Sequence, residues 1–188
     1  GKPVVLSTGA STLDEIRYAV ETINNSGCQA ITLLHCILNY PTPNKYAHLR
    51  MISGLIEAFP DLVIGYSDHT LPDENMTVLT EKNFFSGPYH FFVIGDDPEK
   101  QISNFVSQIK NYRPPNLAPV VDIEETSFVY TPKPDKKEIQ DALLKALKLV
   151  EEKTGCSPIV YTNLTFANKY LDNQLLSKYK LCLADYNK

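Results

Sequence analysis

Residues 118–163 read APVVDIEETSFVYTPKPDKKEIQDALLKALKLVEEKTGCSPIVYTN, and their pattern identifies one repeat of the fold. The apolar run at 118–123 predicts a buried strand. From Lys136 to Lys153 apolar residues recur every three or four positions and Gly155 follows, which predicts a long helix ended by a glycine. A second apolar run, at 157–162, predicts another strand. This order is typical of two parallel strands joined by a crossover helix.

The same alternation extends through the rest of the chain. Apolar runs predict five more strands, at residues 3–7, 30–36, 62–66, 89–93 and 180–184. Periodic apolar residues predict helices that begin after Thr12 and that span 49–56, 98–112 and, in a short form, 166–171. About seven strands in a βα repeat predict an α/β fold of parallel strands, built either as an open doubly wound sheet or as a (β/α)8-type barrel.

The length of the chain bears on the barrel. A whole (β/α)8 barrel has about 250 residues, and this chain has 188. No GxGxxG or GxxxxGKS/T motif follows a predicted strand, which disfavours a nucleotide-binding doubly wound sheet. We therefore expect one barrel-like domain over 1–188, incomplete or hybrid, with βα units in 1–72 and 85–188 and a junction at 72–86.

Composition bears on the classes of partner. The chain has 18 lysines and arginines against 22 aspartates and glutamates, a net charge of −4, and no basic tract. We expect no nucleic-acid partner, because binding phosphates requires a cationic face. We expect no membrane partner, because no apolar run approaches the ~18 residues of a span. The first residues lack the charged and apolar regions of a signal peptide, so none is expected in this chain.

Histidines and cysteines near the strands have alternative roles. Cys36 and Cys182 lie in apolar runs and are expected to be small core residues, and no CxxC pair is present. His35 also lies in an apolar run and is expected in the core. His69, in the sequence SDHT after the third strand, is interpreted as a metal ligand, a proton shuttle or a hydrogen-bonded loop residue.

The sharpest candidate site is Asp122-Ile123-Glu124, at the end of the fifth predicted strand. Residues i and i+2 of a strand point to one face, so Asp122 and Glu124 should project together. Because two ionised carboxylates repel each other, one pKa rises and that group can act as a general acid. Such a pair suits glycoside cleavage, in which a carboxylic acid protonates the leaving oxygen. The alternative is a pair of solvated acids at a strand end.

Five motifs between about 87 and 188 are GPYHFF (87–92), DDPEKQISNFV (96–106), APVVDIEE (118–125), IVYTN (159–163) and LCLADYN (181–187). In this order they resemble the glycoside hydrolase family 25 muramidases (lysozymes). The resemblance implies cleavage of the β-1,4 bond between N-acetylmuramic acid and N-acetylglucosamine in peptidoglycan, with Glu124 as catalytic acid and Asp122 as its carboxylate partner. It places Tyr89 and Asp185 in the cleft. Tyr161 and Asn163, at another strand end, are expected to bind substrate, although strand tyrosines also serve as packing.

Three motifs in about 2–71 are KPVVLSTGAST (2–12), ITLLHCILNYPTP (31–43) and GYSDHT (65–70). They resemble the middle of an N-acetylneuraminate (sialic acid) synthase TIM barrel. That resemblance implies condensation of phosphoenolpyruvate with an N-acetylated sugar and a divalent metal such as manganese. It makes His69 one metal ligand and places Ser7, Asn39 and Tyr40 in the substrate pocket.

Together the two resemblances describe a hybrid of two barrel fragments. Both depart from their families: the aspartate in a D-V-S context and the W-Q-Y element of the muramidases are missing. The string nearest to the E-K/R-H-F motif of the synthases, EKNF at 81–84, comes too early in the chain and has Asn83 in place of the second histidine ligand. Three hypotheses follow: a muramidase without a cofactor, a manganese-dependent synthase, and a catalytically inactive hybrid scaffold. The first implies an extracellular protein and the second a cytoplasmic one. The expected partner is peptidoglycan or an amino sugar.

Overall fold

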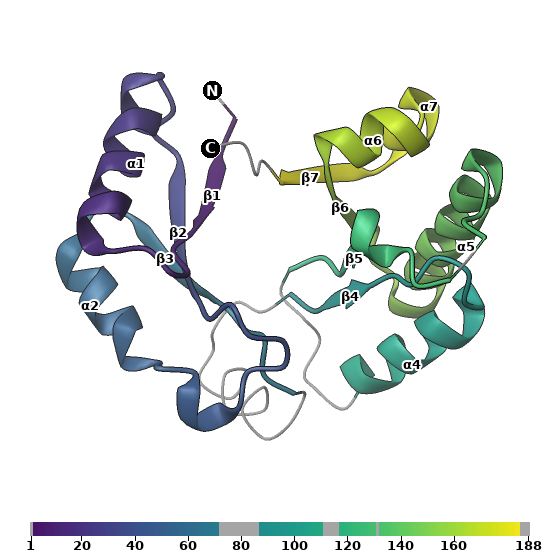
Figure 1. The fold of residues 1–188 in the computed structure, drawn as a ribbon, viewed down its shortest axis with the longest axis horizontal. Helices are drawn as coiled ribbons and strands as arrows, with labels where there is room; N and C mark the ends of the chain where they lie inside the picture. Colours follow the sequence, from purple (N-terminus) through teal and green to yellow (C-terminus); the bar gives the residue numbers. More distant parts are fainter. Residues whose placement is uncertain (1, 72–86, 111–116, 131, 185–188) are drawn as a thin grey trace. The chain divides into compact units, whose positions relative to one another are not determined.

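The structure, a computed structural model, describes residues 2–71, 87–110, 117–130 and 132–184. Within them, seven strands form two parallel sheets, in the orders β1-β2-β3 and β4-β5-β6-β7 (Figure 1). The chain divides into two compact units, residues 1–73 and 74–188, which we call the N-terminal unit and the C-terminal unit. The expected junction at 72–86 lies mostly outside the described residues. No helix in the described ranges combines the length and the apolar character that crossing a membrane requires.

The N-terminal unit alternates strands with helices. Its elements are β1 (Val4–Ser7), α1 (Leu13–Asn25), β2 (Ile31–Cys36), the 3₁₀ turn η1 (Asn44–Tyr46), α2 (Arg50–Ala58) and β3 (Val63–Ser67). A capping box begins α1, because the Thr12 hydroxyl accepts the N–H of Glu15 and the Glu15 carboxylate accepts the N–H of Thr12 at 2.7 Å. Both crossovers place their helix on the same face of the sheet (Figure 1).

One face of the N-terminal sheet forms the core of that unit. Leu33 at the centre of β2 is completely buried, and it clusters with Ile16 of α1 and Leu55 of α2. On the opposite face, Val5 and Val63 are 58% and 66% exposed. Among the described residues, the helices of this unit therefore cover one face of the sheet and leave the other uncovered.

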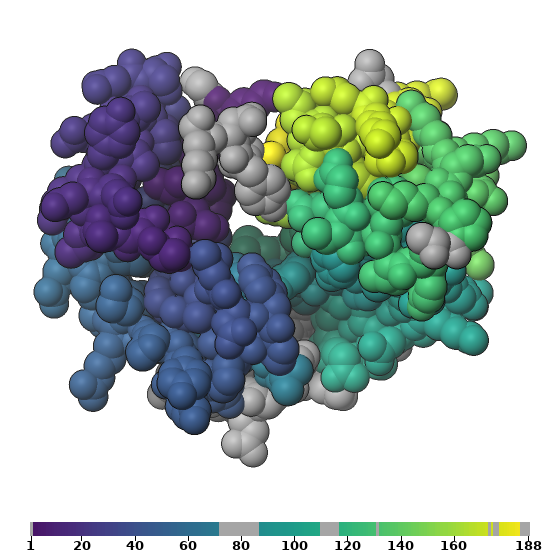
Figure 2. Space-filling view, in the orientation of Figure 1, coloured from purple at the N-terminus to yellow at the C-terminus, as the bar shows by residue number. Residues whose placement is uncertain are grey.

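The C-terminal unit also alternates strands with helices, and it has four strands. Its elements are β4 (Tyr89–Phe91), α4 (Pro98–Lys110), β5 (Val120–Asp122), the 3₁₀ turn η2 (Glu125–Ser127), α5 (Lys136–Thr154), β6 (Ile159–Asn163), α6 (Leu164–Tyr170), α7 (Asn173–Lys178) and β7 (Lys180–Ala184). Helix α5 ends at Gly155, whose φ of 71° favours glycine. Figure 2 shows the side chains of α5 and α6, coloured green to yellow, forming one continuous surface.

The core of the C-terminal unit lies between its sheet and its helices. Val121 of β5, Val160 of β6, Ile102 of α4, Leu143 of α5 and Phe166 of α6 are all completely buried in one cluster. Because burial of each such side chain contributes roughly 1.5–3 kcal/mol, this cluster dominates the stability of the unit.

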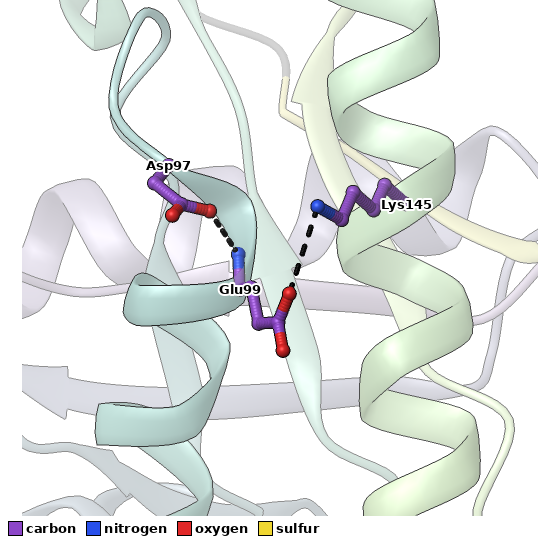
Figure 3. A network of polar contacts seen from close by, with 3 residues as sticks. All are labelled: Asp97, Glu99 and Lys145. Atoms are coloured by element: carbon purple, nitrogen blue, oxygen red, sulfur yellow. Dashed lines mark hydrogen bonds and ion pairs between the residues drawn. The ribbon is translucent and has the colours of Figure 1, made fainter.

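A small polar network joins α4 to α5 (Figure 3). The Asp97 carboxylate accepts the N–H of Glu99 at 2.9 Å in the first turn of α4. Lys145 Nζ of α5 lies 3.8 Å from Glu99 Oε2, and both side chains are more than half exposed. An ion pair this exposed contributes only ~0–1 kcal/mol, so the apolar core holds the two helices together.

Helix α5 depends on its N-cap. The Asp135 carboxylate accepts the N–H of Glu138 at 2.9 Å, and the Glu138 carboxylate accepts the N–H of Asp135 at 2.8 Å. We expect Asp135→Ala to lower the free energy of unfolding of the C-terminal unit by about 1 kcal/mol, because an N–H of the first turn loses its acceptor. Asp135→Asn keeps an acceptor oxygen and should lose less. Urea unfolding followed by circular dichroism tests this, and equal losses in the two variants would contradict it.

The sequence predicted the α/β class and the parallel strands correctly. Both sheets follow chain order without reversal, and the helices of each lie on one face, which is the winding of a barrel and not of a doubly wound sheet (Figure 1). Closure of the seven strands into one barrel stays a prediction. Cys36 is buried as expected, but Cys182 is exposed and the prediction of a core role for it was wrong, because β7 ends the sheet order and this residue lies on the uncovered face.

Candidate functional site

The carboxylate pair lies at the carboxyl end of β5. Asp122 is the last residue of the strand, and Glu124 follows two positions later as the N-cap of η2. Between and beside them, Val121 and Ile123 are completely buried in the core. Because side chains alternate along an extended segment, Asp122 and Glu124 project from the opposite, uncovered face, as the spacing predicted.

Asp122 has an unusual electrostatic environment. Its Oδ1 atom is buried and has no hydrogen-bond partner among the residues that the structure describes. Burial, followed by the negative charge of Glu124, raises the pKa of Asp122 to about 7. Near neutral pH this carboxyl is therefore partly protonated, as is common for a titratable group in a functional site.

Glu124 is held by a short turn. The N–H of Glu124 donates to the Ser127 hydroxyl at 3.0 Å, and the Glu124 side chain accepts a hydrogen bond from the backbone N–H of Ser127. Ser127 is completely buried. The sequence motifs did not single out Ser127. The signal was present in its position three residues after an acid at a strand end, which is capping-box spacing.

A row of side chains crosses the sheet at the level of Asp122. Phe91 of β4, Asp122 of β5, Tyr161 of β6 and Cys182 of β7 are register partners from strand to strand. Partners in parallel strands point to one face, so the other three share the uncovered face with the Asp122 carboxylate. Although the residue is exposed, its thiol is partly shielded from water, and this shielding, followed by the charge of Asp122, raises the pKa of Cys182. Sequence patterns alone did not single out Phe91 or Cys182 for this row.

Aromatic rings accompany the carboxylates on this face. Tyr89 and Phe91 of β4 are 44% and 37% exposed, and Tyr161 is half-buried. The sequence named Tyr89 and Tyr161 as candidates, and the period of two places Tyr89 on the same face as Phe91. Exposed rings next to a carboxylate pair are suited to holding the apolar face of a sugar.

Asn163 and Asp185 are the two remaining candidates of the C-terminal unit. The Asn163 Oδ1 accepts the N–H of Phe166 at 2.8 Å and caps α6, while its Nδ2 donates to Glu125 Oε2 at 2.9 Å. Both ends of its amide are thus engaged within the protein, and a role in substrate binding stays a prediction. Asp185 lies outside the described residues.

The candidate residues of the N-terminal unit lie at or after strand ends. Ser7 ends β1 and is exposed, and Asn39 and Tyr40 are exposed in the loop after β2. The Tyr40 ring lies 4.1 Å from the ring of His69, centroid to centroid. Thr42, in the same loop, donates its N–H to the backbone oxygen of His69 at 2.7 Å, so the loops after β2 and β3 are joined. An open pocket beside them is lined by Pro41, Thr42, Pro43, Asn44 and Leu71.

Both ring nitrogens of His69 have partners. Nδ1 lies 2.8 Å from the backbone oxygen of Ile37, which only accepts, so Nδ1 carries the proton. Nε2 lies 3.2 Å from the Ser67 hydroxyl. No group of three histidine, cysteine, aspartate or glutamate side chains that suits a metal ion occurs among the described residues. The described donor set therefore does not fit a manganese ion at His69, because a stable site needs several such ligands.

His35 is a core residue, as expected. It is 5% exposed, its Nε2 lies 2.8 Å from the backbone oxygen of Ala47, and its ring stacks on Tyr66 at 5.5 Å. The Tyr66 hydroxyl donates to Asp68 Oδ1 at 3.0 Å. Burial, followed by the charge of Asp68, raises the pKa of Tyr66 far above its ordinary value.

Two family models match the chain. The model of the glycosyl hydrolases family 25 matches residues 64–188, and the model of the NeuB family matches residues 1–81. The two models match successive parts of the chain and overlap at 64–81. Because the two parts match different families, the prediction of a hybrid is confirmed.

Curated relatives resemble part of the chain. An uncharacterized protein of Methanocaldococcus jannaschii is 40% identical over 125 residues, which cover 60% of this chain and 35% of that protein. The spore coat polysaccharide biosynthesis protein SpsE of Bacillus subtilis is 32% identical, with 54% and 31% covered. The N,N'-diacetyllegionaminic acid synthase of Legionella pneumophila is 34% identical, with 58% and 34% covered. The chain spans about a third of the length of these relatives.

Solved structures also resemble the chain. A family 25 glycosyl hydrolase from Bacillus anthracis is 16% identical with a TM-score of 0.46, over 99% of this chain and 71% of that one. SpsE from Bacillus subtilis is 22% identical with a TM-score of 0.42, over 83% of this chain and 36% of that one.

Proposed function

We propose that this chain, which belongs to the glycosyl hydrolases family 25 through residues 64–188, cleaves the β-1,4 bonds between N-acetylmuramic acid and N-acetylglucosamine in peptidoglycan. The observation that carries the proposal is the pair of carboxylates on one face at the end of β5, close enough together for the charge of Glu124 to contribute to the raised pKa of Asp122. Glycoside hydrolysis uses two carboxyl groups that flank the scissile bond, one of them protonated.

In the proposed reaction Glu124 gives its proton to the leaving glycosidic oxygen. Asp122, when ionised, stabilises the positive charge that develops at the anomeric carbon. A water molecule then adds its oxygen to that carbon and gives its proton to the Glu124 carboxylate, which restores the acid. Near pH 7 only part of the Asp122 population is ionised. The negative charge of Glu124 contributes to this raised pKa of Asp122.

The neighbouring rings supply the proposed contacts to the sugar. Tyr89 and Phe91 present exposed faces on the same side of the sheet as Asp122. Stacking of a sugar ring on such faces buries apolar surface and leaves its hydroxyls free for hydrogen bonds. Tyr161, in register with Asp122 on β6, borders the site on its other side.

Purified peptidoglycan tests this proposal. The chain should lower the turbidity of a peptidoglycan suspension and create new reducing ends. Borohydride reduction before acid hydrolysis should convert the new ends to muramitol, because cleavage after N-acetylmuramic acid leaves that sugar reducing. Glucosaminitol in its place would contradict the assigned bond, and the absence of new ends would favour the inactive hybrid scaffold.

A second candidate function is a synthase-like condensation of phosphoenolpyruvate with an N-acetylated sugar. The match of residues 1–81 to the NeuB family favours it, together with relatives that are sugar-acid synthases. Ser7, Asn39 and Tyr40 are the exposed residues that would contact this substrate. Consumption of phosphoenolpyruvate in the presence of an N-acetylated sugar would support this candidate.

Manganese binding gives a separate test of the second candidate. Because His69 is the single motif-matched ligand and both its ring nitrogens have partners, we expect less than about 0.1 manganese per chain after dialysis. Elemental analysis of the parent and of His69→Ala should give the same low content. Stoichiometric manganese in the parent that is lost in His69→Ala would contradict this expectation.

A further inference from the structure

Ser127 is a polar residue at the edge of an apolar core. It is the last residue of η2, is completely buried, and forms hydrogen bonds with Glu124 and Ile94. The Ser127 hydroxyl accepts the N–H of Glu124 at 3.0 Å. The Ser127 N–H donates to the Glu124 side chain, and its nitrogen also lies 3.0 Å from the Glu124 backbone oxygen. Its backbone oxygen accepts the N–H of Ile94 at 2.9 Å. Ser127 thereby links Glu124 to the segment that follows β4.

We propose that Ser127 is a positioning residue that fixes the carboxylate of Glu124 beside Asp122. A glutamate side chain has three rotatable bonds, and at an exposed strand end it would sample many orientations. Here the main chain of Glu124 is held through the Ser127 hydroxyl and its carboxylate through the Ser127 N–H. The bond from Ile94 prevents the turn from swinging away, because breaking it would leave buried polar groups unpaired.

The consequence of this restraint is a constant electrostatic field at Asp122. The ionisable groups around Asp122 are Glu124 on its own segment, Tyr161 on β6 and Cys182 on β7, while β4 contributes the uncharged Phe91. Of these, the charge of Glu124 contributes to the raised pKa of Asp122. A carboxylate free to move away would weaken that contribution, because the interaction falls with distance and with solvent screening.

Titration of Asp122 by carbon-13 NMR tests the proposal on the full chain. Glu124→Gln should lower the midpoint of Asp122 by about one pH unit, because it removes the neighbouring charge. Ser127→Ala should lower it in the same direction by about 0.5 unit, because the turn that aims the Ser127 N–H at the Glu124 carboxylate loses the bond between the Ser127 hydroxyl and the Glu124 N–H. The matched control is Thr126→Ala, an exposed neighbour in the same turn, which should leave the midpoint unchanged. A midpoint in Ser127→Ala equal to that of the parent would overturn the proposal.

A second variant and a second measurement cover the case in which Ser127→Ala does not fold. Ser127→Cys keeps a weaker acceptor of similar size and should give an intermediate shift. In the parent, the amide hydrogen of Glu124 should exchange more slowly than that of Thr126, because Ser127 accepts it. Rapid exchange at Glu124 would also overturn the proposal.

The catalytic consequence rests on the proposed function, and the two can fail separately. If the parent cleaves peptidoglycan, Ser127→Ala should lower kcat about tenfold with KM unchanged, because Ser127 acts through Glu124 and not on the substrate. A parent that does not cleave peptidoglycan contradicts the proposed function, whereas the titration and the amide exchange still decide the positioning role. A change confined to KM would overturn the assignment of Ser127 as a positioning residue.

Discussion

Glu124→Gln is expected to lower the rate of peptidoglycan cleavage by roughly 10²–10⁴-fold, which is the usual contribution of a positioned proton donor. The amide matches the carboxyl group in size but has no proton to deliver to the leaving oxygen. Asp122→Asn should cause a smaller loss, because the partner acts through charge and position. The release of muramic-acid reducing ends from purified peptidoglycan measures both variants.

The matched control for charge is Glu152→Gln, an exposed acid on α5 within the C-terminal unit. It should cleave at the rate of the parent. If Asp122→Asn loses more activity than Glu124→Gln, Asp122 is the proton donor, in line with its raised pKa. A Glu124→Gln variant as fast as its parent would remove Glu124 from the reaction.

Asp122→Asn is expected to stabilise the C-terminal unit at alkaline pH by about 2 kcal/mol, after allowance for the partial exposure of the site. The pKa of Asp122 is raised from 3.8 to about 7 in the folded chain, so the folded state holds a proton that the unfolded state has released. The free energy of unfolding therefore falls as pH rises from about 4 to about 7, and the loss is complete above that range. Asparagine cannot ionise, so the advantage of the variant should grow between pH 5 and pH 8.

Hydrogen exchange of the amides in β5 and β6 measures this difference within the C-terminal unit. Asp141→Asn, at an exposed position of α5, is the matched control and should change the free energy of unfolding by less than about 0.5 kcal/mol. Burial lowers the pKa of His90, so that residue destabilises the fold as pH falls below its ordinary range. This opposite trend is common to parent and variant and cancels in the comparison. A constant difference from pH 5 to pH 8 would contradict the prediction.

Local sequence patterns predicted the elements well, because their causes are local. The periodicity of α5 and the glycine at its end marked that helix to within a residue, since Gly155 alone accepts the left-handed turn there. The alternation of side chains along an extended segment likewise predicted that Asp122 and Glu124 share a face. Both inferences use only the geometry of one segment.

The sequence by itself determined the βα order, the helix caps and the placing of two carboxylates on one side of β5. Only the tertiary structure decided which residues of neighbouring strands are register partners. It thereby placed Phe91, Tyr161 and Cys182 in one row with Asp122 across the sheet. It also decided which carboxyl is buried, because the depth of a side chain depends on the elements packed around it and not on its neighbours in the chain. The anchoring of the turn at Ser127 belongs to this second group, since the N–H that its backbone oxygen accepts comes from the distant Ile94.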